Sequence, residues 1–181
     1  LFGQVSARMT EFIALKLGID RVKAKEIQSD YFYKHDTSLN GLLINHPDKI
    51  DAHEFLKFVH TINYDCLEKD VELREELLKL DVKAYCATNG SREHAMNCMK
   101  KIGIDDLFEG KVMDIVDFNF KPKPNTESLK VLCDNFQIPT TEETVHVEDI
   151  CKNLTSETAK NMTKVWFSND EPINTLINIK M

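Results

Sequence analysis

The sequence predicts an α/β protein in which an all-helical unit precedes a parallel, three-layer sheet domain. Two observations support this class. Apolar residues recur at helical spacing through the first third of the chain, and after Leu80 short strand-like runs alternate with amphipathic helices. Strands that alternate with helices favour a parallel sheet with helices on both faces. We therefore expect a helical unit over residues 1–66 and an α/β core over 67–181.

Local signals define the helices of the first unit. The first helix has apolar residues at helical spacing and ends at Gly18, since glycine readily takes the left-handed conformation that stops a helix. A second helix is expected from Asp20 toward Tyr33, followed by a polar loop around Gly41. The run IDAHEFLKFVHTI then predicts a helix capped by Asp51.

The α/β core is predicted from strands and helices in alternation. The expected strands are VKAYCAT, KVMDIVDF, TVHVED and TKVWFS. The expected helices are SREHAMNCMKKIGI, which Gly103 ends, TESLKVLCDNF and CKNLTSETAKNM. No glycine-rich phosphate loop of a common type occurs.

The charge of the chain excludes some partners. The 181 residues carry a formal net charge of −7, and Lys and Arg form no dense block. Nucleic acids and membrane surfaces are bound through basic patches, so we expect neither as a partner. No apolar run reaches the length of a membrane span, and no signal peptide is visible.

The five cysteines indicate a cytoplasmic setting. Their number is odd and they contain no Cys-x-x-Cys pair, which argues against a disulfide framework and against a zinc ribbon. Thiols of this kind are typical of reducing compartments. The six histidines show no catalytic or metal-binding spacing and are interpreted as solvated or structural.

Polar side chains follow three of the expected strands. Ligands of parallel sheets bind beyond the carboxyl ends of the strands. Thr88 and Asn89 lie at the end of the first strand, and a hydroxyl beside the N–H groups of a turn can bind an oxyanion. Lys121 lies in a Lys-Pro-Lys-Pro run, where prolines stiffen the backbone. Glu148 and Asp149 end the strand TVHVED, and one or two carboxylates plus phosphate oxygens can hold Mg²⁺.

Each group alone also has a purely local explanation. Thr88 and Asn89 can simply form the turn before a helix, Lys121 can be solvated, and Asp149 can cap the next helix. Asn153 can orient Asp149 or be exposed. Together, a hydroxyl, a cation and paired carboxylates on successive strand ends favour binding of a phosphoryl group beside a divalent metal.

The same stretches carry a resemblance to a known family. LFGQVSARMTEFI, GLLINH, EFLKFVHTINYD, ELREELLKL, TNGSREHA, GIDDLFEG, FKPKPN and VEDICKNL occur in family order and cover nearly the whole chain. The chain resembles the haloacid-dehalogenase-like phosphohydrolases, in their pyrimidine 5′-nucleotidase branch. The resemblance implies a Rossmann-like core, a helical cap over residues 1–66, Mg²⁺, an aspartyl-phosphate intermediate and a nucleoside monophosphate as substrate.

The resemblance also implies a role for each candidate residue. Thr88, with Asn89, corresponds to the phosphate-binding position, and Lys121 to the lysine that faces phosphate. Asp149, with Glu148, corresponds to the metal-binding pair.

One departure from the family is clear. The nucleophile of the family lies in an Asp-x-Asp-x-Thr motif on its first core strand, and no Asp-x-Asp occurs in these residues. We therefore expect the chain to lack that strand and to be inactive by itself. A sugar phosphatase, a dehalogenase or a non-catalytic binding protein remain alternatives, whereas a receiver domain is rejected because its motifs occur in another order.

Overall fold

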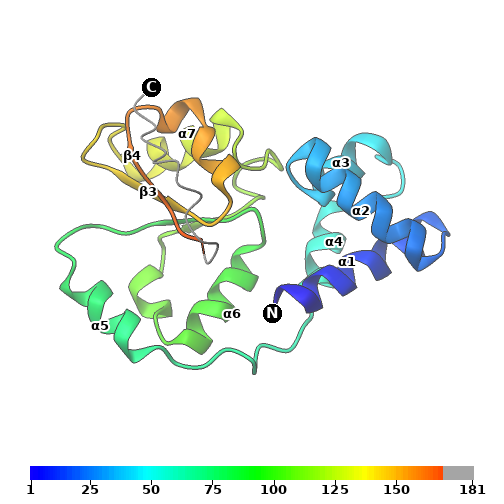
Figure 1. The fold of residues 1–181 in the computed structure, drawn as a ribbon, viewed down its shortest axis with the longest axis horizontal. Helices are drawn as coiled ribbons and strands as arrows, with labels where there is room; N and C mark the ends of the chain where they lie inside the picture. The colour runs from blue at the N-terminus through cyan, green and yellow to red at the C-terminus, as the bar shows by residue number, and fades with distance from the viewer. Residues whose placement is uncertain (169–181) are drawn as a thin grey trace. The chain divides into compact units, whose positions relative to one another are not determined.

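The computed structural model describes residues 1–168, which form two compact units. One unit spans Leu1–Phe120 and the other begins at Lys121. The mixed α/β class is confirmed, because helices accompany small parallel sheets (Figure 1). The three-layer arrangement, the cap and the boundary near residue 66 remain predictions, and residues 169–181 of the expected core lie outside the described residues.

Four helices at the start of the chain share one hydrophobic core. They are α1 (Phe2–Leu17), α2 (Arg21–His35), α3 (Ser38–Asn45) and α4 (Ala52–Val59), drawn blue to cyan in Figure 1. Their largest buried side chains are Phe12, Ile13, Leu42, Phe55 and Val59. The expected signals hold: Gly18 has a φ of 67° and ends α1, and the Asp20 carboxylate accepts from Val22 N and Lys23 N.

The polar loop expected around Gly41 is wrong, because these residues form α3. The Thr37 hydroxyl caps this helix by accepting from Asn40 N at 3.1 Å. Gly41 lets α3 approach α2 closely, since a Cβ atom there would lie 2.4 Å from Tyr31 Cβ. The polar residues of this segment led us to expect a loop. The segment instead forms a helix that packs closely against α2 at Gly41.

The remainder of the first unit contains a small sheet. The elements are α5 (Val71–Lys79), β1 (Cys86–Ala87), α6 (Arg92–Ile102), the 3₁₀ turn η1 (Asp105–Phe108) and β2 (Val112–Met113). β1 pairs in parallel with β2, with Cys86 opposite Val112. Both strands are shorter than the apolar runs that predict them. After β2, the Asp114 side chain accepts from backbone N–H groups of the next residues and turns the chain.

Within residues 121–168, the second unit contains one longer helix and a second two-stranded sheet. Its elements are α7 (Thr126–Phe136), β3 (Val145–Glu148), the 3₁₀ turns η2 (Cys151–Thr155) and η3 (Glu157–Ala159), and β4 (Thr163–Trp166). β3 and β4 pair in parallel, from Val145 opposite Thr163 to Glu148 opposite Trp166. The single helix expected over CKNLTSETAKNM is wrong. The extended ψ of 132° at Ser156 divides the segment into the two short turns.

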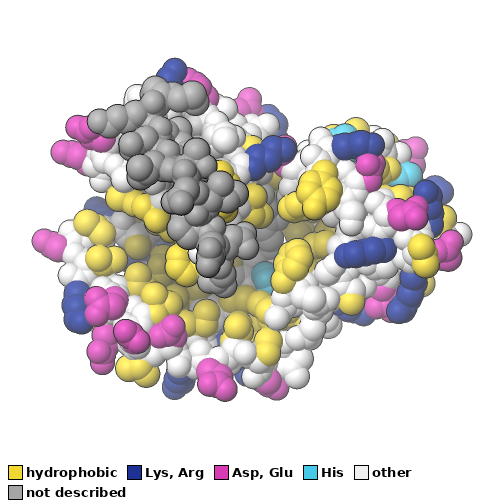
Figure 2. All heavy atoms as spheres, in the orientation of Figure 1, with side chains coloured by type: hydrophobic (Ala, Val, Ile, Leu, Met, Phe, Trp, Pro, Cys, Tyr) yellow, Lys and Arg dark blue, Asp and Glu magenta, His cyan; other side chains and the backbone are white. Residues whose placement is uncertain are grey.

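Basic side chains are dispersed on the face of the molecule that Figure 2 draws. Figure 2 shows Lys and Arg in small groups between Asp and Glu on the face drawn. Several form exposed ion pairs along helices, among them Lys34 with Asp30 and Lys23 with Glu26. Among the described helices, none combines the length and apolarity needed to cross a membrane.

Candidate functional site

Thr88 and Asp114 follow the two paired strands of the first unit. β1 and β2 are parallel with Ala87 opposite Met113, and Thr88 N continues the ladder by donating to Met113 O at 3.0 Å. The two residues therefore leave the same edge of the sheet, where ligands of parallel sheets bind. The Thr88 hydroxyl oxygen accepts from Gly90 N at 3.0 Å. Its own proton remains available for donation to an oxyanion.

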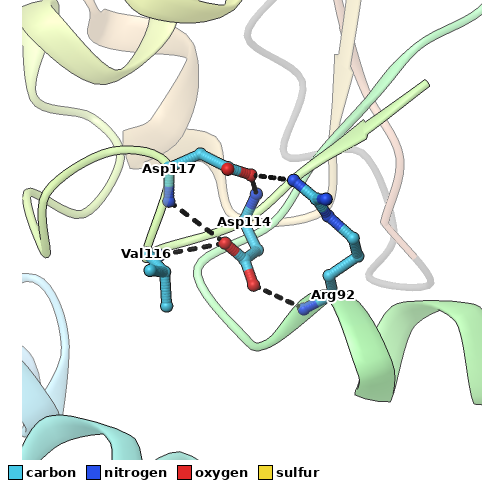
Figure 3. Close-up of polar contacts among 4 residues, drawn as sticks. All are labelled: Arg92, Asp114, Val116 and Asp117. Atoms are coloured by element: carbon cyan, nitrogen blue, oxygen red, sulfur yellow. Dashed lines mark hydrogen bonds and ion pairs between the residues drawn. The ribbon is translucent and has the colours of Figure 1, made fainter. Parts of the chain in front are cut away.

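Asp114 holds the first turn of α6 in place. Its side chain accepts from Arg92 N at 2.7 Å, from Val116 N at 3.0 Å and from Asp117 N at 3.1 Å (Figure 3). The Asp117 carboxylate in turn accepts from Asp114 N at 2.8 Å and from the Arg92 guanidinium at 2.5 Å. This reciprocal arrangement fixes the turn that contains Thr88 against the segment after β2.

The hydrogen bonds of Asp117 favour the ionised form of its carboxylate. Burial alone would raise the pKa of Asp117, but the Asp114 N–H and the Arg92 guanidinium hold that pKa below its usual range. Sequence reasoning missed Asp114, which is only 7% exposed. The available signal was the Asp-x-x-Asp spacing directly after a strand, a pattern in which the first aspartate accepts from the backbone two and three residues on.

Glu148 lies buried at the end of β3 with a cation beside it. Lys123 Nζ lies 2.5 Å from Glu148 Oε1, and the two side chains are 11% and 6% exposed. Asn153 donates to Oε2 at 3.2 Å, and His146 Nε2 lies 3.6 Å from Oε1. Burial alone would raise the pKa of Glu148, but the bond with His146 and the charge and hydrogen bond of Lys123 lower it.

The two lysines of the Lys-Pro-Lys-Pro run have different partners. Lys121 forms an exposed ion pair with Glu127 at the start of α7, and its carbonyl accepts from Ser128 Oγ. Lys123 is the one that meets Glu148. Sequence reasoning selected Lys121 and missed Lys123 and His146, because residue spacing gives no sign of which lysine turns toward the strand end.

The expected metal pair is divided between a buried and an exposed carboxylate. Both oxygens of Glu148 have protein partners, whereas Asp149 is exposed and its backbone carbonyl accepts from Trp166 Nε1 at 2.9 Å. Within residues 1–168, no cluster of three or more His, Cys, Asp or Glu side chains is arranged to hold a metal ion. Mg²⁺ can be held by one or two carboxylates with substrate oxygens and water, so Asp149 fits this role better than Glu148.

The candidate residues belong to both units. Thr88 and Asn89 lie in Leu1–Phe120, while Lys121, Glu148, Asp149 and Asn153 lie in the unit that begins at Lys121. The structure brings Glu148 and Asn153 together. That all six residues converge on one ligand remains a prediction.

Comparison with known proteins decides the family. The family model described as haloacid dehalogenase-like hydrolase matches residues 11–156, which include every candidate residue. The chain belongs to the haloacid dehalogenase-like hydrolases. The chain is 30% identical over 111 residues to phosphate metabolism protein 8 of Saccharomyces cerevisiae (strain ATCC 204508 / S288c). The match covers 56% of this chain and 34% of the yeast protein, so the chain spans about a third of the length of that relative.

Proposed function

We propose that the protein is a Mg²⁺-dependent phosphatase that hydrolyses nucleoside 5′-monophosphates, with pyrimidine nucleotides as first candidates. The observation that carries the proposal is the family match over residues 11–156, because it spans Thr88, Lys121 and Asp149 together. The name of the yeast relative, a phosphate metabolism protein, agrees with a phosphorylated substrate. The nucleotide preference comes from the sequence resemblance.

The phosphate-binding residues have chemistry suited to this task. The Thr88 hydroxyl accepts from Gly90 N and keeps its proton for a phosphoryl oxygen. Lys121 supplies a positive charge, and its present ion pair with Glu127 is solvent-exposed. Exposed ion pairs contribute little free energy, so a dianionic phosphate can replace Glu127 as the partner of Lys121 at small cost.

The exposed carboxylate of Asp149 is the proposed protein ligand of Mg²⁺. When bound, the ion neutralises phosphate charge and so favours attack by an anionic nucleophile. The buried Glu148, with Lys123 and Asn153, would hold the strand end from which Asp149 projects. In the family reaction, an Asp carboxylate attacks phosphorus and water then hydrolyses the carboxyl phosphate. We assign the attack to none of these residues.

A substrate panel tests the proposal. Phosphate release by the complete gene product is measured with cytidine, uridine, adenosine and guanosine monophosphates, a sugar phosphate and a haloacid. We expect the pyrimidine nucleotides to have the highest kcat/KM of the compounds in this panel. Faster turnover of the sugar phosphate would replace the nucleotide assignment, and halide release without phosphate release would overturn the phosphatase assignment.

A further inference from the structure

His60 packs against the turn that contains Thr88. It follows α4, and its ring stacks on the ring of His94 from α6 with centroids 4.2 Å apart and planes inclined by 9°. A Cβ atom added to Gly90 would lie 3.5 Å from His60 Nε2 and 3.4 Å from Thr88 Oγ1. The imidazole and the threonine hydroxyl thus flank the same glycine.

A hydrogen bond joins this ring to the end of the turn. His60 Nδ1 lies 2.9 Å from Ser91 Oγ. Ser91 caps α6, and its hydroxyl oxygen also accepts from His94 N at 3.2 Å. The Ser91 hydroxyl can donate its proton to His60 Nδ1 when the ring is neutral and carries its own proton on Nε2. Burial and the neighbouring His94 lower the pKa of His60 to about 4, so the ring is neutral at pH 7.

A second connection runs through Tyr64. The Tyr64 hydroxyl donates to His60 O at 3.1 Å and lies 2.9 Å from His94 Nδ1. Because the hydroxyl proton is used by the carbonyl, His94 Nδ1 must carry the proton that it shares with Tyr64. The other nitrogen of His94 then faces Cys98 Sγ at 3.9 Å as an acceptor. The end of α4 is therefore bonded to α6 through both its backbone and its side chain.

We propose that His60 is a positioning residue that ties the end of α4 to the Thr88–Ser91 turn and so holds that turn in the conformation that binds phosphate. This inference rests on the proposed role of Thr88 and adds a residue to which the sequence assigned no function. His60 acts through Ser91 and contacts no reacting atom. Loss of its hydrogen bond should loosen the turn and weaken phosphate binding.

Two substitutions separate hydrogen bonding from packing. His60→Asn removes most of the ring but places an amide where Nδ1 lies. His60→Leu retains volume without a hydrogen-bonding group. His53→Leu, on the exposed side of α4, is the control. The readouts are the Kd of inorganic phosphate for the chain and hydrogen–deuterium exchange of residues 88–91.

We expect His60→Leu to raise the phosphate Kd by roughly tenfold, about the effect of one ordinary hydrogen bond, and to speed exchange in the turn. His60→Asn and His53→Leu should remain close to the wild type. If His60→Asn and His60→Leu weaken phosphate binding equally, or if His60→Leu leaves the phosphate Kd unchanged, the inference is overturned. Failure of the wild-type chain to bind phosphate would overturn the role of Thr88 and with it the functional part of the inference. The exchange rates would still decide whether His60 holds the turn.

Discussion

Lys123 Nζ and Glu148 Oε1 lie 2.5 Å apart, and both side chains are almost fully removed from solvent. A buried carboxylate that already has an ammonium partner does not need a metal ion to neutralise it. Removal of one member leaves the other as an uncompensated buried charge. We therefore expect the Lys123–Glu148 pair to stabilise the fold, whereas the sequence predicted a metal-binding role for Glu148.

We expect Lys123→Met to lower the free energy of unfolding by about 3–5 kcal/mol, since Glu148 would lose its cation. The double variant Lys123→Met/Glu148→Gln should lose less than the sum of the single changes. Urea unfolding measures each value. Lys130→Met, which removes the exposed Lys130–Asp134 pair, is the control and should cause no measurable change. Additive effects would show that the buried pair is not coupled.

The lowered pKa of His60 predicts a pH dependence of stability. Its pKa is 6.5 in the unfolded chain and about 4 when folded, so the unfolded state binds the proton more readily. The stability contributed by the neutral ring is complete above pH 6.5 and is lost as pH falls through about 4. The shift corresponds to about 3 kcal/mol.

Unfolding measured between pH 7.5 and 4 should therefore show a steeper loss for the wild type than for His60→Leu, which has no titrating ring. The contribution of Glu148 to the free energy of unfolding is also lost on acidification, because its pKa is lowered in the folded chain. That loss occurs only below the unfolded carboxyl pKa of 4.5. Parallel curves for the two proteins over pH 6.5–4.5 would contradict the assignment.

Asp114→Asn tests the turn in front of α6. The amide would place N–H donors where one carboxylate oxygen now accepts from a backbone N–H group. We expect a loss of about 2–3 kcal/mol in the free energy of unfolding, because buried donors lose their charged acceptor. Asp134→Asn, on the exposed side of α7, is the matched control. Equal stability of the two variants would show that Asp114 does not hold the turn.

Gly41 and Gly3 form a pair for testing helix packing. A Cβ atom at Gly41 would meet Tyr31 at 2.4 Å, whereas a Cβ atom at Gly3 would have no neighbour within 4 Å. Gly41→Ala should destabilise by about 1–3 kcal/mol through overpacking. Gly3→Ala should stabilise α1 by up to about 1 kcal/mol through helix propensity. Thermal unfolding of both variants measures these changes in stability. A Gly41→Ala variant as stable as the wild type would contradict the close contact of α2 with α3.

The helices were predictable where the signal is local. Asp20 and Asp51 cap helices and Gly18 and Gly103 end them, as their neighbours in sequence indicate. The helix at Gly41 was not predictable, because its reason is a contact with Tyr31 on another helix. The strands are shorter than their apolar runs, because a strand also needs a hydrogen-bonded partner.

The candidate site was predictable only in part for a similar reason. The sequence indicated which strand ends carry polar groups, and the family match covers all of them. It did not indicate that Lys123, two residues beyond Lys121, would pair with Glu148. Nor did it indicate that Asp114 would be buried against backbone N–H groups. Side-chain direction after a proline or a turn depends on three-dimensional partners that residue spacing does not contain.

The proposed phosphatase activity is tested most directly by the rate of phosphate release as a function of Mg²⁺ concentration. The complete gene product and its Asp149→Asn variant are compared on a pyrimidine nucleoside monophosphate, with Asp134→Asn as control. We predict that EDTA abolishes release, that Mg²⁺ restores it, and that Asp149→Asn lowers the rate by roughly 100-fold, as expected for loss of a charged group at a metal. Full activity in EDTA would contradict a Mg²⁺-dependent phosphatase. An Asp149→Asn variant as active as Asp134→Asn would contradict the role of Asp149 as the Mg²⁺ ligand.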